Sequence, residues 1–180
     1  MSRHALPGFN TPAVGFEQPY EMLESCHSRV QRTLDLLQRL VAHVQAHGHD
    51  TQSCAAAADV LRYFDIAAPL HHADEELHVF PLLQASDDAS LHAAVVSLQA
   101  DHRQMETCWA ALRQPLLRWR EPGCTDNVSP QWHDTLQQFL ALYQGHMALE
   151  EGQVFPAARA RTDAPTLAAM SQHMQARRQA

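Results

Sequence analysis

Two stretches of this 180-residue chain, LHHADEELHVFP (70–81) and GHMALEEGQVFP (145–156), carry one pattern twice. Histidine, alanine, two adjacent glutamates, valine, phenylalanine and proline recur at matching places, 75 residues apart. The same offset pairs residues outside these stretches: His27 with His102, Leu61 with Leu136, Phe64 with Phe139 and Gly48 with Gly123. The sequence therefore indicates an internal duplication, in which each copy is a pair of elements.

Helical spacing dominates the chain from residue 19 onward. Apolar residues at three- and four-residue steps predict a first helix that ends at Gly48 in a left-handed cap. A second helix is expected to begin at about Ser53 as its N-cap, to bend at Pro69, and to run to the VFPLL segment (79–83), with the Phe80-Pro81 pair as a helix end. Phe155-Pro156 repeats that ending in the second copy.

The second half predicts the same two elements again. A third helix is expected to start near the acidic caps Asp87 and Asp88 and to end before Pro122, and Ser129-Pro130 is typical of the start of a fourth. Since no segment alternates with period two, the fold class expected is all-α, an up-down-up-down four-helix bundle. We expect an N-terminal extended arm over residues 1–18, the bundle over 19–160, and a tail over 161–180 with a short helix after Pro165.

Composition excludes several classes of partner. Acidic residues outnumber basic ones by 20 to 13, and no Lys/Arg cluster indicates binding to nucleic acid or to an anionic membrane. No apolar run has the length of a membrane span or a signal peptide. The four cysteines are widely separated, without a C-x-x-C pair, which favours a reducing compartment. A cytoplasmic protein is therefore expected.

The repeated H-x-x-x-E spacing predicts metal ligands. His71 with Glu75, and His146 with Glu150, stand four residues apart, so on a helix the two side chains point about 40° apart into one pocket. The repeat-related pair of His27 and His102 adds one imidazole from each opposing helix. Four buried histidines and two glutamates would be a costly unpaired core without a metal, and they supply ligands for two ions.

Several nearby residues leave alternatives open. His72 stands about 100° around the helix from His71 and is repeated as Met147, so it is a candidate third nitrogen on one ion or a non-ligand. Glu106 lies four residues after His102 but is repeated as Gln31, which favours a solvated helix face. Buried free thiols are expected at Cys26 and Cys108. The remaining histidines are predicted to be structural or exposed: His43, His47, His49, His78, His92 and His133.

At these residues the chain resembles the hemerythrin-like, or HHE cation-binding, family from about His27 to Pro156. The oxygen carriers of that family have a second histidine one turn after the third-helix ligand, where this chain has Glu106, and the HH-x-x-EE pattern resembles the bacterial members more closely. The resemblance implies iron ligands on all four helices, with both glutamates bridging: His27, His71, Glu75, His102, His146 and Glu150.

Function is predicted from the metal centre. Mixed imidazole and carboxylate ligands favour two iron ions, and they also fit manganese or zinc. The family resemblance implies binding of O2 or NO in a sensing, scavenging or stress-protective role, more in keeping with a ligand-binding protein than a dedicated enzyme. Iron sensing, iron storage and iron-donating repair are the alternatives, and the sequence leaves a protein partner or homo-oligomer open.

A ferritin-like diiron oxidase is the competing architecture. It uses a Glu-x-x-His spacing on two helices, which Glu24-His27 and Glu75-His78 both satisfy. The duplication does not keep this spacing, because Gln99 and Gln153 stand at the repeats of Glu24 and His78. The ferritin-like reading is therefore the weaker one.

Overall fold

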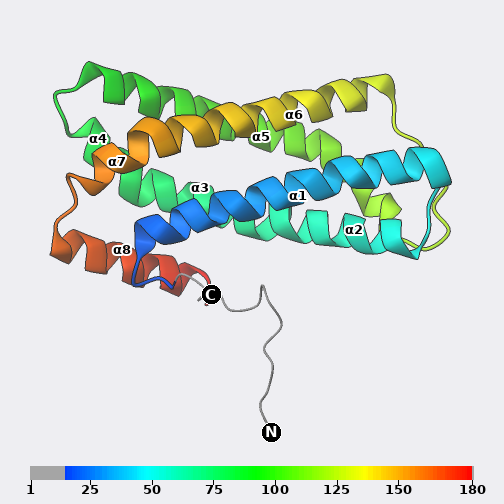
Figure 1. Ribbon diagram of the computed structural model, residues 1–180, viewed down its shortest axis with the longest axis horizontal. Coiled ribbons are helices and arrows are strands. Elements are labelled where there is room, and N and C mark those ends of the chain that lie inside the picture. Colours follow the sequence, from blue (N-terminus) through cyan, green and yellow to red (C-terminus); the bar gives the residue numbers. More distant parts are fainter. Residues whose placement is uncertain (1–14, 180) are drawn as a thin grey trace, which may run out of the picture.

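The computed structural model describes residues 15–179, so residues 1–14 of the expected N-terminal arm lie outside the described residues. Four long helical segments and one shorter C-terminal helix account for nearly all of the described chain (Figure 1). Their bounds are α1 Pro19–His47; α2 Thr51–Arg62, α3 Ala68–Asp74 and α4 Phe80–Gln84 in one run; α5 Ala89–Trp119; α6 Pro130–Leu149 and α7 Phe155–Arg159 in one run; and α8 Ala164–Arg177.

Capping side chains determine where the helices begin. Asp88 and Ser129 cap α5 and α6 as expected, each accepting hydrogen bonds from the first backbone N–H groups. The expected N-cap at Ser53 is wrong, because Asp50 caps α2 and Ser53 occupies the third helical position. Asp50 Oδ1 accepts from the Ser53 backbone at 2.8 Å, and Ser53 Oγ accepts from the Asp50 backbone at 2.9 Å. Gly48 ends α1 at φ 78°, although its ψ of −166° differs from the left-handed cap expected.

Three π-helical turns interrupt the long helices, each just before a proline: η1 Tyr63–Ala67, η2 Glu75–Val79 and η3 Glu150–Val154. A proline cannot donate the backbone hydrogen bond of an α-helix and crowds the carbonyl four residues earlier. The irregularity expected at Pro69 therefore takes the form of a widened turn. Pro81 and Pro156 were expected to end their helices, but the helix continues for one more turn after each, to Gln84 and Arg159.

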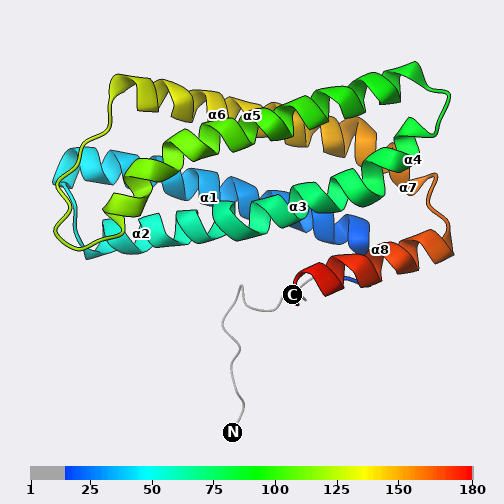
Figure 2. The same cartoon turned by 180° about the vertical axis from the view of Figure 1, so that it is seen from behind.

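The four long segments run side by side in alternating directions, joined by short connections (Figures 1 and 2). Helix α1 lies along α2 and α3, and α5 lies along α6, in both views. No strand occurs in the described residues 15–179. The expected all-α four-helix bundle is confirmed.

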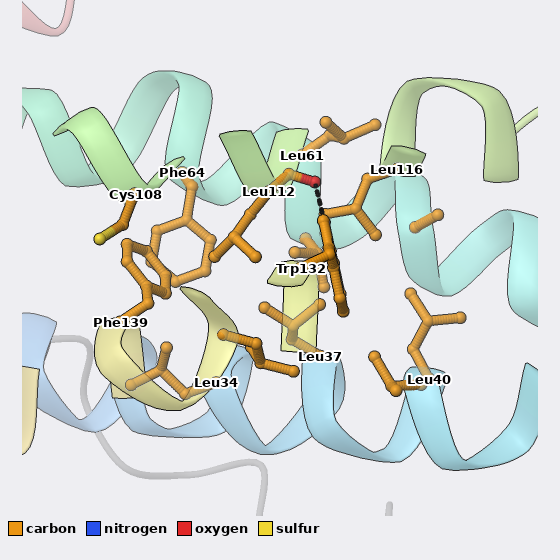
Figure 3. Close-up of a cluster of buried hydrophobic side chains, with 14 of the residues drawn as sticks. Leu34, Leu37, Leu40, Leu61, Phe64, Cys108, Leu112, Leu116, Trp132 and Phe139 are labelled. Atoms are coloured by element: carbon orange, nitrogen blue, oxygen red, sulfur yellow. Dashed lines mark hydrogen bonds between the residues drawn. The ribbon is translucent and has the colours of Figure 1, made fainter. Parts of the chain in front are cut away.

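Two apolar clusters fill the interior, one toward each end of the bundle. The first contains Leu34, Leu37, Phe64, Leu112 and Phe139, and Trp132 closes it by donating from Nε1 to the Leu112 carbonyl at 3.3 Å (Figure 3). The second is built mainly from the segments at the other end and from α8, and contains Leu23, Val79, Phe80, Leu98, Val154, Phe155, Met170 and Met174. Along every long segment, a short stretch of buried polar residues separates the two clusters.

Helix α8 packs on the end of the bundle through Met170 and Met174, both of which are fully buried. Arg177 ends α8 and Arg178 follows it, and both form ion pairs with the carboxylate of Asp74, which is fully buried at the end of α3. The expected C-terminal helix is therefore present, and it is attached by apolar contacts and by a buried charge cluster.

Candidate metal centre

The polar layer between the two apolar clusters consists of the predicted ligands. All are at most 4% exposed, and each of the four long segments contributes at least one: His27, His71, Glu75, His102, His146 and Glu150. The π turns η2 and η3 begin at Glu75 and Glu150, so the helix widens at the residue that carries each carboxylate. Such turns are frequent at functional sites because they redirect side chains without ending the helix.

The six side chains form two groups that share both carboxylates. His27 and His71 join Glu75 and Glu150 in one group, and His102 and His146 join the same two glutamates in the other. Within each group, one ligand atom from every residue lies within 4.8 Å of the others. Two cation-sized sites therefore lie next to each other in the middle of the bundle.

Each carboxylate directs one oxygen to each group. Glu75 Oε1 lies 3.1 Å from His71 Nε2, while Glu75 Oε2 lies 3.5 Å from His102 Nε2. Glu150 Oε2 lies 3.1 Å from His27 Nε2, while Glu150 Oε1 lies 3.3 Å from His146 Nε2. This division of oxygens is the arrangement that a bridging carboxylate needs.

These short approaches are not hydrogen bonds. Both oxygens of Glu75, both oxygens of Glu150 and Nε2 of His27 are buried and have no hydrogen-bond partner among residues 15–179. Unpaired buried polar atoms are costly, and a cation that accepts their lone pairs removes the cost. The donor set therefore fits a pair of metal ions.

The charge state of the two carboxyl groups supports the same conclusion. Burial and the adjacent charge of Glu150 raise the pKa of Glu75 well above its ordinary value. The imidazoles of His146 and His27 outweigh burial and lower the pKa of Glu150. Two buried like charges repel, so without a cation the two carboxyl groups do not ionise together easily. Bound cations would allow both to ionise.

The ligand histidines differ in charge preference. Burial lowers the pKa of His71 well below its ordinary value, and burial together with the His146 ring lowers the pKa of His102 to about 3. Burial acts on His27 as well, but the carboxylates of Glu150 and Glu151 outweigh it and raise the pKa of His27. Neutral imidazoles are the form that binds metal.

Three outer carboxylates orient the ligand rings. His27 Nδ1 contacts Glu151 Oε1 at 2.7 Å, His102 Nδ1 contacts Glu76 Oε1 at 2.8 Å, and His146 Nδ1 lies 3.4 Å from Asp101 Oδ2. A carboxylate at Nδ1 favours the proton there and turns Nε2 toward the centre, where the Nε2 atoms of His102 and His146 lie 3.1 Å apart. The sequence predicted Glu76 and Glu151 only as non-ligands. Their preservation at the 75-residue offset was the signal for this role.

Among the four ligand histidines, His71 is the one without an outer carboxylate at Nδ1. Its Nδ1 is buried and has no hydrogen-bond partner in the described chain. The repeat of Asp101 is position 26, which is Cys26, a buried free thiol that contacts Met22 Sδ at 3.6 Å. The outer carboxylate present in the second copy is therefore missing from the first.

His72 and Glu106 belong to neither ligand group. The His72 ring stacks on His102, with ring centroids 4.0 Å apart and planes 14° apart, and its Nε2 is buried without a partner. Glu106 lies on the exposed face of α5. The ferritin-like spacing is not assembled either: Glu24 is exposed and pairs with Arg159, and His78 lies outside both groups.

The histidines that were predicted to be structural or exposed belong to neither ligand group. His43 contacts Asp50 at 2.9 Å, and His49 contacts the Asp126 carbonyl at 2.8 Å. Cys26 and Cys108 are buried free thiols, as expected. Among the helices of residues 15–179, none is long and apolar enough to cross a membrane.

Comparison with known proteins agrees with this geometry. The family described as Hemerythrin HHE cation binding domain matches residues 18–158, most of the chain. A protein of Haemophilus influenzae, described only as uncharacterized, is 33% identical over 168 residues, which cover 91% of this chain and 92% of that protein.

Proposed function

We propose a function from one premise: this chain belongs to the hemerythrin HHE cation-binding family. The bundle binds two iron ions between its two apolar clusters, and the diiron centre takes O2 or NO as a small ligand. The protein then serves in sensing, scavenging or protection against these molecules.

One observation supports the dinuclear centre above all others. Glu75 and Glu150 each direct one oxygen toward the His27/His71 group and the other toward the His102/His146 group. A carboxylate that spans two cations offsets their mutual repulsion. Two independent sites would not need both carboxylates at their shared boundary.

The ligand types favour iron among the available metals. Imidazole and carboxylate together suit iron, and a site without thiolate is unlike structural zinc sites. Cys26, which precedes His27 in the chain, contacts Met22 and belongs to neither ligand group. Bound iron would supply a redox-active centre with positions open to a diatomic ligand.

The chain's own residues hold and protect that centre. His27 and His102 are fixed by outer carboxylates, so their Nε2 atoms face inward. Phe155 stacks on His27 with centroids 5.4 Å apart, and Phe80 stacks on His102 with centroids 5.7 Å apart. These two rings belong to the second apolar cluster and cover the layer on that side.

Spectroscopy of iron-loaded protein tests this function. Protein loaded with ferrous iron without oxygen should give a new near-ultraviolet or visible band when NO or O2 is added. Loaded protein that binds iron but shows no spectral change with either gas would overturn ligand binding. It would favour iron storage or donation instead.

A further inference from the structure

A small cavity of about 60 Å³ lies beside the second ligand group. Its lining comes from α3, α5, α6 and the turn η1: Phe64, Ala68, Pro69, His72, Met105, Glu106, Trp109 and Tyr143. We name it the His72 cavity. Its volume is enough for a small ligand, since about 10–15 Å³ of such space already holds one water.

The cavity is lined mostly by apolar side chains, and His72, Glu106 and Tyr143 are its lining residues that carry polar groups. Phe64 contacts both other aromatic rings of the lining, with its centroid 5.0 Å from that of Trp109 and 5.7 Å from that of Tyr143. The His72 Nε2 is buried and has no partner among the described residues. Apolar walls with a few polar groups are typical of small-molecule sites.

His72 links the cavity to the metal centre. Its ring lies face to face with His102 at 4.0 Å, and its centroid is 6.0 Å from that of His146. Glu106, on the exposed side of α5, lines the cavity at its outer side. The cavity therefore extends from the protein surface to within one imidazole ring of the second ligand group.

The first ligand group has different residues at the equivalent positions. The repeats of His72, Glu106 and Tyr143 are Met147, Gln31 and Ala68. Met147 and Gln31 line a wide groove of about 330 Å³ next to His27, and Met147 offers a thioether in place of an imidazole. An imidazole beside a small, mostly apolar cavity thus stands where the other copy of the repeat has a thioether.

We propose that the small ligand of the metal centre reaches it through the His72 cavity, and that His72 Nε2 hydrogen-bonds the ligand beside His102. This inference rests on the proposed diiron function and adds to it. It assigns the ligand to the His102/His146 group, and it gives His72 a role in binding the ligand rather than the metal.

Azide binding to iron-loaded protein tests the role of His72. The His72→Ala variant should keep two iron ions per chain and bind azide about 10- to 100-fold more weakly, the worth of one hydrogen bond to a charged group. His72→Gln should recover part of the affinity, because its amide can donate. Met147→Ala, the repeat-matched control, should change azide affinity less than about twofold.

A second variant tests the route. Ala68→Leu fills the cavity from a position that contacts no ligand oxygen, and it should slow azide association about tenfold with the iron content unchanged. A His72→Ala variant that binds azide like the wild type, or that loses an iron ion, would overturn the inference. Wild-type protein that takes up no iron would overturn the proposed function itself, a result distinguishable from the first two.

Discussion

The two halves of the metal centre have the same ligands and different surroundings. His27 and His71 in one half, and His102 and His146 in the other, meet the same pair of carboxylates. One layer further out, Asp101 in the second half is replaced by Cys26 in the first, and His72 on one side is replaced by Met147 on the other. The duplication has kept what two cations need and changed what sets their reactivity, so the two ions should not behave alike.

Loss of a bridge should have the largest effect, because both halves depend on it. Glu75→Ala or Glu150→Ala should reduce bound iron from two per chain toward one or none, as measured by metal analysis after reconstitution. Glu106→Ala is the matched control, since Glu106 also stands four residues after a ligand histidine but is exposed. Equal iron loss in the control, or retention of two ions without Glu75, would disprove the bridging geometry.

The outer carboxylates should have a smaller effect that differs between positions. Glu151→Ala and Glu76→Ala should each weaken iron binding about 10- to 100-fold, since carboxylates at Nδ1 orient the ring and raise its basicity. Asp101→Ala should weaken iron binding less. The Asp101 oxygen lies 3.4 Å from His146 Nδ1, whereas the Glu151 oxygen lies 2.7 Å from His27 Nδ1. Competition with a chromophoric chelator would measure this order, with Glu21→Ala as the unaffected reference.

A further difference between the two copies of the repeat should affect the stability of the fold. Asp74 is fully buried and pairs with Arg177 and Arg178, whereas its repeat is Leu149. Asp74→Ala leaves two partly buried guanidinium groups unpaired and should lower the free energy of unfolding by about 2–3 kcal/mol. The melting temperature of the metal-free protein should fall by about 5–10 °C.

A matched surface pair provides the comparison for that experiment. Glu24→Ala removes the exposed contact with Arg159 and should cost less than about 1 kcal/mol. If the Asp74→Ala and Glu24→Ala variants have the same melting temperature, the attachment of α8 by the buried carboxylate does not stabilise this protein.

In the metal-free protein, the pKa values of the repeat-related His27 and His102 should be shifted in opposite directions from that of a free histidine. Burial and the His146 ring lower the pKa of His102 to about 3, so its neutral form contributes stability above pH 6.5 that is lost as the pH falls toward 3. The carboxylates of Glu150 and Glu151 raise the pKa of His27 despite its burial, so its contribution is present below pH 6.5 and is lost as the pH rises through the raised value.

Ring nitrogen shifts in NMR spectra would follow both histidines at once. The His27 ring should still be protonated at pH 6.5, where the His102 ring is neutral. Identical titration of the two rings near pH 6.5 would contradict the difference between their surroundings. The Glu151→Ala variant should bring the His27 pKa down, which separates the effect of that carboxylate from burial.

The sequence predicted the fold and the inner layer of the centre because both leave periodic signals. Apolar spacing and the H-x-x-x-E repeats determine which helix face is buried, and this places His71 and His146 inside without knowledge of the packing. The π turns at Glu75 and Glu150 leave no such signal, since they arise where a following proline disturbs an otherwise regular helix.

Contacts between helices were the part that the sequence could not supply. Glu76 lies 26 residues from His102, and Glu151 lies 124 residues from His27, so their contacts depend on how the segments pack. Asp50 was missed as a cap for a simpler reason, because Ser53 also fits the cap pattern and only the backbone geometry separates the two. The position of His72 likewise required the packed bundle.

X-ray absorption at the iron edge, with metal analysis of the same sample, tests the central claim most directly. Protein reconstituted with ferrous iron should contain two iron ions per chain, with an iron neighbour about 4 Å or less from each iron, the separation typical of two-metal sites. One iron per chain, or two irons without an iron neighbour at that distance, would contradict a centre bridged by Glu75 and Glu150.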